Sequence, residues 1–322
     1  MRIINNQNEI KVNLPILARE EYLKCKSNNY GWIENDDFII PFIIDKRLIF
    51  KRLVFTDGLI KKRSDLSQND EKEFLEEMIK FIKSQHICDF IAKPQSNVFF
   101  SVCPKNAECI EWGTYISEIQ KDDEELLKSF HSKHRNVIRK SLKEGLKVEF
   151  INDENIVYEN IKNTLLRQKS PYYPSLNYLK CLKQNIPNNL LMAVVKKENN
   201  IQGSAIVVFD EKRGYYMYGG SIERPFTGSI NLLQYEIMKN LRDRGVKYYD
   251  FVGARICVEK RSKYEGIQRF KSRFGAELKK GYAFRVIYKP FKYKVFNFLA
   301  SIYLKKHGLK YEDSFESIRN CK

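Results

Sequence analysis

The sequence is poor in the residues that build metal centres and disulfide frameworks. Its seven cysteines are scattered, odd in number and never arranged as C-x-x-C, so we expect neither a disulfide framework nor a zinc site. Among only four histidines, His131 and His134 form an H-x-x-H pattern without a third ligand. Because His134 lies on an apolar stripe, it is interpreted as a core histidine rather than a metal ligand.

The sequence also has no segment that looks like a signal peptide or a membrane span. Residues 1–16 contain Arg2, Glu9 and Lys11 and no apolar core of signal-peptide length. The longest apolar stretch, FIIPFII at 38–44, is far shorter than the ~20 residues that cross a bilayer. We therefore expect a cytoplasmic protein, with a location at the inner face of the membrane left open.

Acidic residues are scarce in the second half of the chain. Residues 1–120 carry 17 Lys/Arg and 18 Asp/Glu, a net charge of −1, whereas residues 121–322 carry 40 and 22, a net charge of +18. This asymmetry indicates that the second half binds an anionic partner such as nucleic acid, a phosphorylated small molecule or an acidic membrane surface. The alternative is a surface of solvated lysines without a partner.

The length of 322 residues corresponds to about two domains of roughly 150 residues each. Both halves run strands, helix, strand, which predicts an α+β fold built from a duplicated unit. We expect an N-terminal domain at 1–119 and a C-terminal domain at 120–290 that opens with a bridging helix at 122–144. A basic, aromatic helix or tail follows at 291–322.

Four ordered motifs of the second half carry a family resemblance. They are KHRNVIRKSLKEGLKV (133–148), YYMYGGS (215–221), LLQYEIMKNLRDRGVKYYDFVGA (232–254) and GIQRFKSRFGAE (266–277). In this order they resemble the FemABX family, the aminoacyl-tRNA-dependent transferases that add amino acids to the stem peptide of peptidoglycan precursors. The first half of the chain is similar to the family only in size and coarse element order.

The resemblance implies two tandem GNAT-like domains, each a mixed sheet flanked by helices, with an interdomain cleft between them. It implies aminoacyl-tRNA as the donor co-substrate and no bound cofactor. In the GNAT superfamily a glycine-rich loop holds the pyrophosphate of an acyl-CoA. The loop at 224–229 departs from the superfamily's R/Q-x-x-G-x-G/A pattern. It has only one glycine, and Arg224 does not stand at the position of the pattern's first residue.

An amine that attacks an activated acyl carbon needs no protein nucleophile, only orientation, a proton acceptor and a stabilised oxyanion. Lys271 falls where the family places its Phe-Lys pair, so the resemblance implies that Lys271 stabilises the oxyanion or the terminal ribose and phosphate beside Phe270. The alternation at 266–275 also fits a half-buried strand with a core Phe270 and Phe274 and a solvated Lys271. Asp57 and Asp250, at strand ends, are candidate proton acceptors, yet each also suits a turn cap.

Candidate substrate-binding residues lie in the second half. The strip 255–280 holds nine basic residues against three acids, interleaved with aromatics, which suits a tRNA acceptor end or nucleotide phosphates as well as a solvated basic face. Arg167 ends a predicted helix, where an arginine can clamp a diphosphate or complement the helix dipole. The paired glycines Gly219 and Gly220 can let a substrate approach the backbone beside Tyr218. The candidates are Arg167, Tyr218, Gly219, Arg224, Arg269 and Arg273.

The segment 291–310 combines aromatic residues with lysines and contains no acid. As a helix it suits peripheral contact with an anionic membrane, which would bring the protein to a lipid-linked acceptor. The alternative is a C-terminal helix that packs its aromatics on the second domain.

The sequence thus favours a transferase that moves an aminoacyl group from aminoacyl-tRNA, or an acyl group, to an amine of a nucleotide- or lipid-linked cell-wall or surface-glycan precursor. One alternative is an acyl-CoA-dependent N-acyltransferase acting on an amino sugar or a similar acceptor. Another is a non-catalytic RNA- or membrane-binding protein on the same scaffold.

Overall fold

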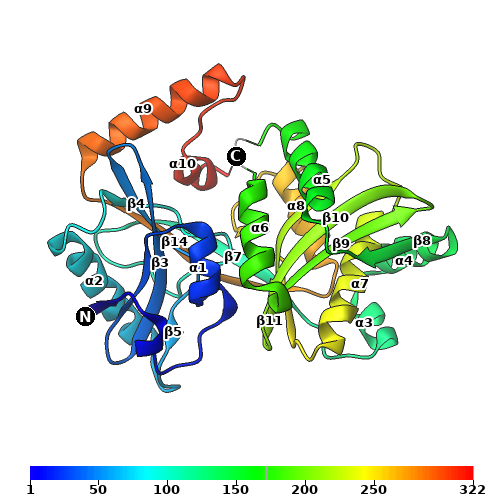
Figure 1. Ribbon diagram of the computed structural model, residues 1–322, viewed down its shortest axis with the longest axis horizontal. Coiled ribbons are helices and arrows are strands. Elements are labelled where there is room, and N and C mark those ends of the chain that lie inside the picture. Colours follow the sequence, from blue (N-terminus) through cyan, green and yellow to red (C-terminus); the bar gives the residue numbers. More distant parts are fainter. Residues whose placement is uncertain (171–172, 322) are drawn as a thin grey trace. The chain divides into compact units, whose positions relative to one another are not determined.

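The computed structural model describes residues 1–170 and 173–321, which divide into two compact units (Figure 1). Of these residues, unit 1 comprises 1–113, 253–265 and 280–321, and unit 2 comprises the described part of 114–252 together with 266–279. The units therefore differ from the consecutive domains predicted at 1–119 and 120–290. The chain re-enters unit 1 twice because late segments complete its sheet, an arrangement that chain order does not reveal.

Unit 1 is built on a mixed sheet with the strand order β1-β2-β3-β4-β6-β14. All neighbours are antiparallel except β4 and β6, and β5 pairs with the start of β3. The strands are β1 (Arg2–Ile4), β2 (Tyr30–Glu34), β3 (Phe38–Arg47), β4 (Phe50–Phe55), β5 (Ile60–Lys61), β6 (Phe90–Ile91) and β14 (Glu277–Ile287).

The core of unit 1 lies between this sheet and α2 (Gln68–Ser84), whose buried apolar residues recur at helical spacing. A capping box between Ser67 and Asp70 starts α2. Phe74 of α2 packs against Phe38, with ring centroids 5.3 Å apart. The remaining helices of unit 1 are η1 (Gln7–Glu9), η2 (Ile16–Ala18), α1 (Glu20–Lys26), α9 (Pro290–Lys306) and α10 (Ser314–Arg319).

Unit 2 carries the strand order β7-β12-β11-β10-β9-β8, in which only β11 and β12 are parallel. The strands are β7 (Glu108–Glu118), β8 (Leu146–Phe150), β9 (Leu190–Lys197), β10 (Asn200–Phe209), β11 (Arg213–Ser221) and β12 (Tyr248–Asp250). The short β13 (Ala254–Arg255) pairs with the first half of β7, and both of these segments belong to unit 1.

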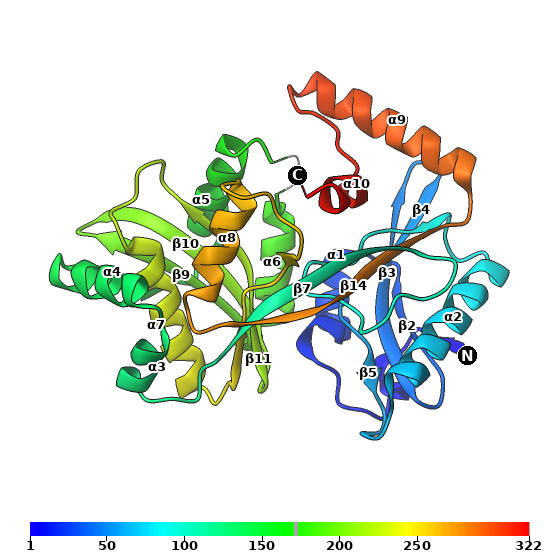
Figure 2. The ribbon, with the colours of Figure 1, turned by 180° about the vertical axis from the view of Figure 1, so that it is seen from behind.

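Helices cover both faces of the unit 2 sheet. α5 (Glu154–Arg167) and α6 (Leu176–Asn185) lie in front of it in Figure 1, and α4 (Ser132–Lys143) and α7 (Ser229–Asp243) lie in front in the reverse view of Figure 2. η3 (Pro187–Asn189) precedes β9, and α8 (Lys263–Ser272) carries the motif at 266–275. The predicted α+β class, with two units that each hold a mixed sheet flanked by helices, is confirmed.

The bridging helix predicted at 122–144 is two helices, α3 (Asp123–Ser129) and α4, and both belong to unit 2. The chain is extended at Phe130, where ψ is 151°, and His131 then caps α4 by accepting a hydrogen bond from the Lys133 N–H. The apolar periodicity continues through both helices, so it did not reveal this break.

The expectation that no cysteines pair is wrong. Disulfides join Cys103 to Cys109 and Cys257 to Cys321, with Cα atoms 6.1 and 5.0 Å apart. Sequence spacing could not predict the second pair, because it joins residues 64 positions apart that only the fold brings together.

Candidate active site

The stretch 266–275 forms the second half of α8 and the turn after it, and not the strand that alternation suggested. Residues four apart share a helix face, so Phe270 and Phe274 lie together, with ring centroids 5.1 Å apart. Phe274 is fully buried and packs on Phe251 of unit 2. Alternation and helical spacing coincide over so short a segment, which is why the strand expectation was wrong.

Lys271 is buried in unit 2 at the last turn of α8, with 9% of its surface exposed. Its ammonium donates a hydrogen bond to the carbonyl of Val252 at 2.6 Å. Burial lowers the pKa of Lys271 to about 8, and the negative charge of Asp250 partly opposes that shift. The alternative interpretation of Lys271 as a solvated spacer is therefore wrong.

The carbonyl that holds Lys271 belongs to a turn with unusual backbone geometry. Val252 has a φ of 38° and Gly253 a φ of 70°. A β-branched residue rarely adopts this left-handed region, and such strain persists where surrounding contacts impose it. The contact that holds Val252 is the hydrogen bond from its N–H to Asp250, at 2.8 Å.

Asp250, at the end of β12, is fully buried. One carboxylate oxygen accepts hydrogen bonds from the Thr114 hydroxyl and the Val252 N–H, and the other lies 3.4 Å from the Arg213 guanidinium. Burial raises the pKa of Asp250, and the charge of Arg213 opposes the shift. These contacts make Asp250 a positioning residue for the turn that binds Lys271, whereas its role as proton acceptor stays a prediction.

His134 lies in the core of unit 2, as the sequence predicted. Its Nε2 is 3.0 Å from the Phe270 carbonyl oxygen, and its ring packs on Phe274 at 4.6 Å. Burial lowers the pKa of His134 to about 4, so the imidazole is neutral at pH 7 and its Nε2–H donates to the carbonyl. Across residues 1–170 and 173–321, no group of three or more His, Cys, Asp or Glu could hold a metal ion.

The loop between β11 and α7 is fixed by internal contacts. The Phe226 N–H donates to Gln202 at 2.9 Å, and the Arg167 guanidinium donates to the Ser221 carbonyl at 2.9 Å. Arg167 thus ties α5 to the start of this loop, a contact that neither of its predicted roles included. Arg224, within the loop, is exposed.

Gly228 begins α7 with a φ of 90°, and a Cβ at this position would collide with the Val137 carbonyl and the Ser141 hydroxyl of α4. Gly228→Ala is therefore expected to lower the free energy of unfolding by about 1–3 kcal/mol, as measured by urea denaturation. Gly266→Ala in α8 is the matched control, because a Cβ there meets nothing within 4 Å, and it should stabilise by about 0.5–1 kcal/mol. Equal stabilities for the two variants would contradict this packing role.

Tyr218 and Gly219 lie on β11, next to a β-bulge where the register with β10 shifts. Tyr218 is half-buried, and burial raises its pKa to about 12. A Cβ on Gly219 would collide with the Tyr216 hydroxyl, so the absence of a side chain serves packing inside unit 2. Substrate binding by these two residues stays a prediction.

The remaining predicted residues are more exposed. Arg269 is exposed on α8 and Arg273 is half-buried just after it, where its carbonyl accepts the His131 N–H at 2.9 Å. Asp57, in unit 1, accepts the Gly58 N–H at 2.8 Å and so caps the turn after β4. The catalytic role of Asp57 stays a prediction.

Two cations of unit 1 lie on aromatic rings. The Lys93 ammonium lies 3.8 Å from the centre of the Trp112 ring, and the Arg255 guanidinium lies 3.6 Å from that of Tyr264. Burial lowers the pKa of Lys93 to about 8, and the charge of Arg255 lowers it further. Sequence reasoning missed Lys93 and Trp112; the available signal was a lysine two residues after the buried strand β6.

Comparisons with known proteins agree with the resemblance. Residues 179–301, which include Lys271, match the FemAB family. The chain is 28% identical over 234 residues to the lipid II:glycine glycyltransferase of Staphylococcus haemolyticus, covering 51% of this chain and 56% of that protein. It is 25% identical to the Staphylococcus epidermidis protein of the same name, covering 51% and 55%. The chain thus spans about half the length of these relatives.

Solved structures share the fold over most of the chain. A crystal structure of FemX superposes with a TM-score of 0.64 at 18% identity, covering 92% of this chain and 99% of that one. The C-terminal domain of a putative lysylphosphatidylglycerol synthetase from Agrobacterium fabrum gives 0.52 at 12% identity, covering 88% and 90%. Residues 179–301 thus match the FemAB family, and most of the chain shares the fold of the FemX structure.

Proposed function

We propose that this protein is an aminoacyltransferase that moves an aminoacyl group from aminoacyl-tRNA to an amine of a lipid-linked peptidoglycan precursor. The observation that carries the proposal is the buried ammonium of Lys271, held at the Val252 turn inside the segment that matches the FemAB family. Lipid II, in the names of the two staphylococcal relatives, supplies the acceptor class.

The reaction forms an amide C–N bond and breaks the ester C–O bond that joins the aminoacyl group to the terminal ribose. The acceptor nitrogen loses a proton, and the ribose hydroxyl leaves with one. After the amine has attacked and before the ribose hydroxyl leaves, the oxygen of the former carbonyl carries a negative charge. The Lys271 ammonium stabilises this charge. A cation held in a partly desolvated site stabilises such charge more than one in water does.

Two features support tRNA over acyl-CoA as the donor. The second half of the chain has a net charge of +18, which favours a polyanion. In the loop before α7, the Phe226 N–H is already bonded to Gln202, so this backbone donor is not directed at a pyrophosphate. Lys93 and Arg255, each on an aromatic face, supply charge and stacking surfaces for nucleotides.

The decisive experiment is a donor screen by mass spectrometry, in which charged tRNAs and acyl-CoAs are offered with a lipid-linked peptidoglycan precursor. We expect product only from charged tRNA, and no product after RNase treatment. We also expect the rate at low donor concentration to fall by about tenfold or more between roughly 50 and 200 mM salt.

Each other outcome of this screen identifies a different function. RNase-resistant turnover with an acyl-CoA would instead establish an acyl-CoA-dependent N-acyltransferase. Retention of RNA or liposomes without consumption of any donor would establish a binding protein and exclude the transferase.

A further inference from the structure

The outer face of α9 exposes large apolar side chains along its whole length. Phe291 is 80%, Phe298 65% and Tyr303 63% exposed. Leu299 and Ile302 are 42% and 50% exposed, and all five recur at the three- and four-residue spacing of a single helix face. Single exposed apolar residues are ordinary, whereas a continuous apolar stripe marks an interaction surface.

A second exposed apolar group lies at the tip of the β3–β4 hairpin. Arg47 pairs with Phe50, so Leu48 and Ile49 form a two-residue turn, and they are 81% and 67% exposed. Leu48 has a φ of 53°, a conformation for which such turns usually use glycine or asparagine. Two large apolar residues here serve neither the turn nor a core.

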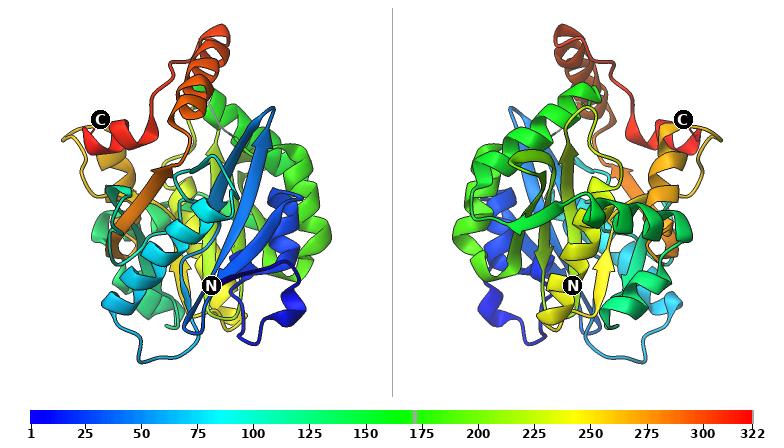
Figure 3. Two further views of the ribbon diagram at one scale, coloured as in Figure 1. Left: turned by 90° about the vertical axis from the view of Figure 1, so that its left-hand side faces the viewer. Right: turned by 90° about the vertical axis from the view of Figure 1, so that its right-hand side faces the viewer.

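The hairpin tip and α9 form one surface. Lys292 of α9 donates a hydrogen bond to the Ile49 carbonyl at 3.0 Å, and Phe296 packs on Phe50 with ring centroids 5.5 Å apart. Figure 1 shows the start of α9 beside the end of this hairpin, and the side views of Figure 3 show α9 beyond the strand ends of unit 1. We call this surface the apolar ridge; it comprises Leu48, Ile49, Phe291, Phe298, Leu299, Ile302 and Tyr303.

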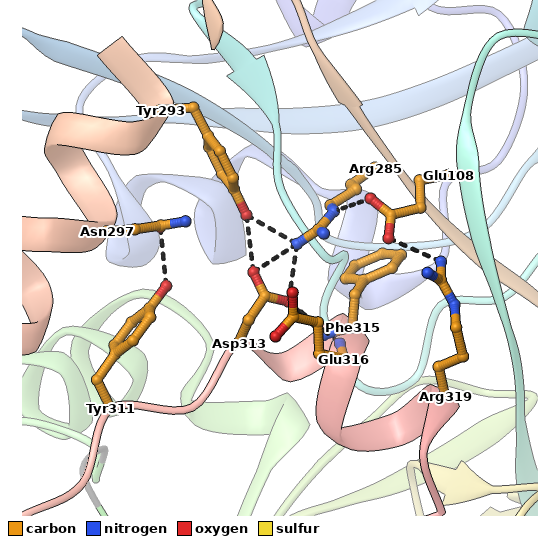
Figure 4. A network of polar contacts seen from close by, with 9 residues as sticks. All are labelled: Glu108, Arg285, Tyr293, Asn297, Tyr311, Asp313, Phe315, Glu316 and Arg319. Atoms are coloured by element: carbon orange, nitrogen blue, oxygen red, sulfur yellow. Dashed lines mark hydrogen bonds and ion pairs between the residues drawn. The ribbon is translucent and has the colours of Figure 1, made fainter. Parts of the chain in front are cut away.

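The inner face of α9 is anchored, as Figure 4 shows. The hydroxyl of Tyr293 accepts from Arg285 at 2.7 Å and donates to Asp313 at 3.0 Å, and the Tyr311 hydroxyl donates to Asn297 at 2.8 Å. Phe90 of unit 1 packs on Tyr293 at 5.0 Å. The C-terminal helix α9 thus packs on unit 1, and its apolar ridge is presented by a fixed helix.

The surroundings of the apolar ridge are basic. No acidic residue occurs from 290 to 311, and Lys294, Lys305 and Lys306 are exposed on α9 itself. On the hairpin, Lys46 and Lys51 are exposed and directly opposite each other. Like charges in such a pair destabilise a hairpin, and an anionic surface would relieve that repulsion.

We propose that the apolar ridge docks unit 1 on the surface of an anionic lipid bilayer. An exposed apolar stripe flanked by lysines is the pattern of helices that lie in the plane of a membrane interface, and the lysines add attraction to anionic headgroups. A second copy of the chain is a poorer occupant, because a symmetric contact would place the lysines of one α9 against those of the other. No helix in the described ranges is long and apolar enough to cross a membrane.

This inference goes beyond the proposed transferase function, because it concerns a separate surface of unit 1. Membrane binding by this surface is measured without donor or acceptor. The test is co-sedimentation with vesicles of phosphatidylglycerol and phosphatidylcholine, compared with phosphatidylcholine alone. We expect binding to the anionic vesicles and weaker binding as salt rises. The double variant Phe298→Ser/Ile302→Ser should bind about tenfold or more weakly, because two apolar side chains no longer enter the interface.

The matched control is Leu142→Ser/Ile156→Ser, which removes two exposed apolar residues of unit 2 that are 48% and 38% exposed. It should bind as the native protein does, and thermal melting should be unchanged in both variants. Absence of binding to anionic vesicles, or equal weakening by both double variants, would overturn the proposal. So would a concentration-dependent dimer that Phe298→Ser/Ile302→Ser abolishes while vesicle binding is absent.

Discussion

Lys271→Met is expected to lower the turnover number with aminoacyl-tRNA by about two to three orders of magnitude, as the loss of one oxyanion-stabilising contact does. The methionine fills a similar volume but cannot stabilise negative charge. The stability of the fold should change little, because the native protein already desolvates this ammonium. Single-turnover kinetics with saturating donor measure the chemical step directly.

The matched control is Lys279→Met, which removes an exposed lysine that pairs with Glu277. This variant should keep the native turnover number. Turnover within about twofold of native in Lys271→Met would reassign Lys271 to a structural role, because oxyanion stabilisation accounts for far larger factors.

The pH dependence of the rate follows from the same lysine. In the proposed mechanism the charged form of Lys271 stabilises the oxyanion. Because the pKa of Lys271 is about 8, the rate should fall as the pH rises through 8. The stability of the fold depends on pH in the opposite direction. The unfolded chain holds this proton up to a pH of about 10.5, whereas the folded protein releases it near pH 8. The free energy of unfolding therefore increases as the pH rises from 8 to 10.5.

Asp250→Ala is expected to lower the free energy of unfolding by about 3 kcal/mol or more, because a buried acceptor is lost. The Thr114 hydroxyl, the Val252 N–H and the Arg213 guanidinium all lose their contact with Asp250. The left-handed Val252 turn also loses the contact that holds it. Urea denaturation of the native protein and the variant measures the difference.

Asp250→Asn separates the charge of this residue from its hydrogen bonds. The amide oxygen can still accept from Val252 and Thr114, so stability should be largely kept. The charge of Asp250 raises the pKa of Lys271, so the alkaline fall of the rate should move to below pH 8. An unchanged pH profile would show that Asp250 acts only through structure.

The sequence alone supplied the family resemblance and the fold class, and it singled out Lys271 as a candidate site residue. The chain contains four motifs in the order and spacing of the family. Its composition also separates a first half with a net charge near zero from a basic second half. Apolar residues at helical spacing also mark α2, because this pattern extends over several turns.

Only the tertiary structure decided what each of these residues contacts. The burial of Lys271 depends on a turn 19 residues away in the chain, and the Cys257–Cys321 disulfide joins residues 64 positions apart. The helical structure at 266–272 and the packing of Ile49 and Phe50 on α9 likewise depend on long-range contacts. Local pattern specifies which face of a segment is apolar, whereas the partner of that face is set by the free energy of the whole fold.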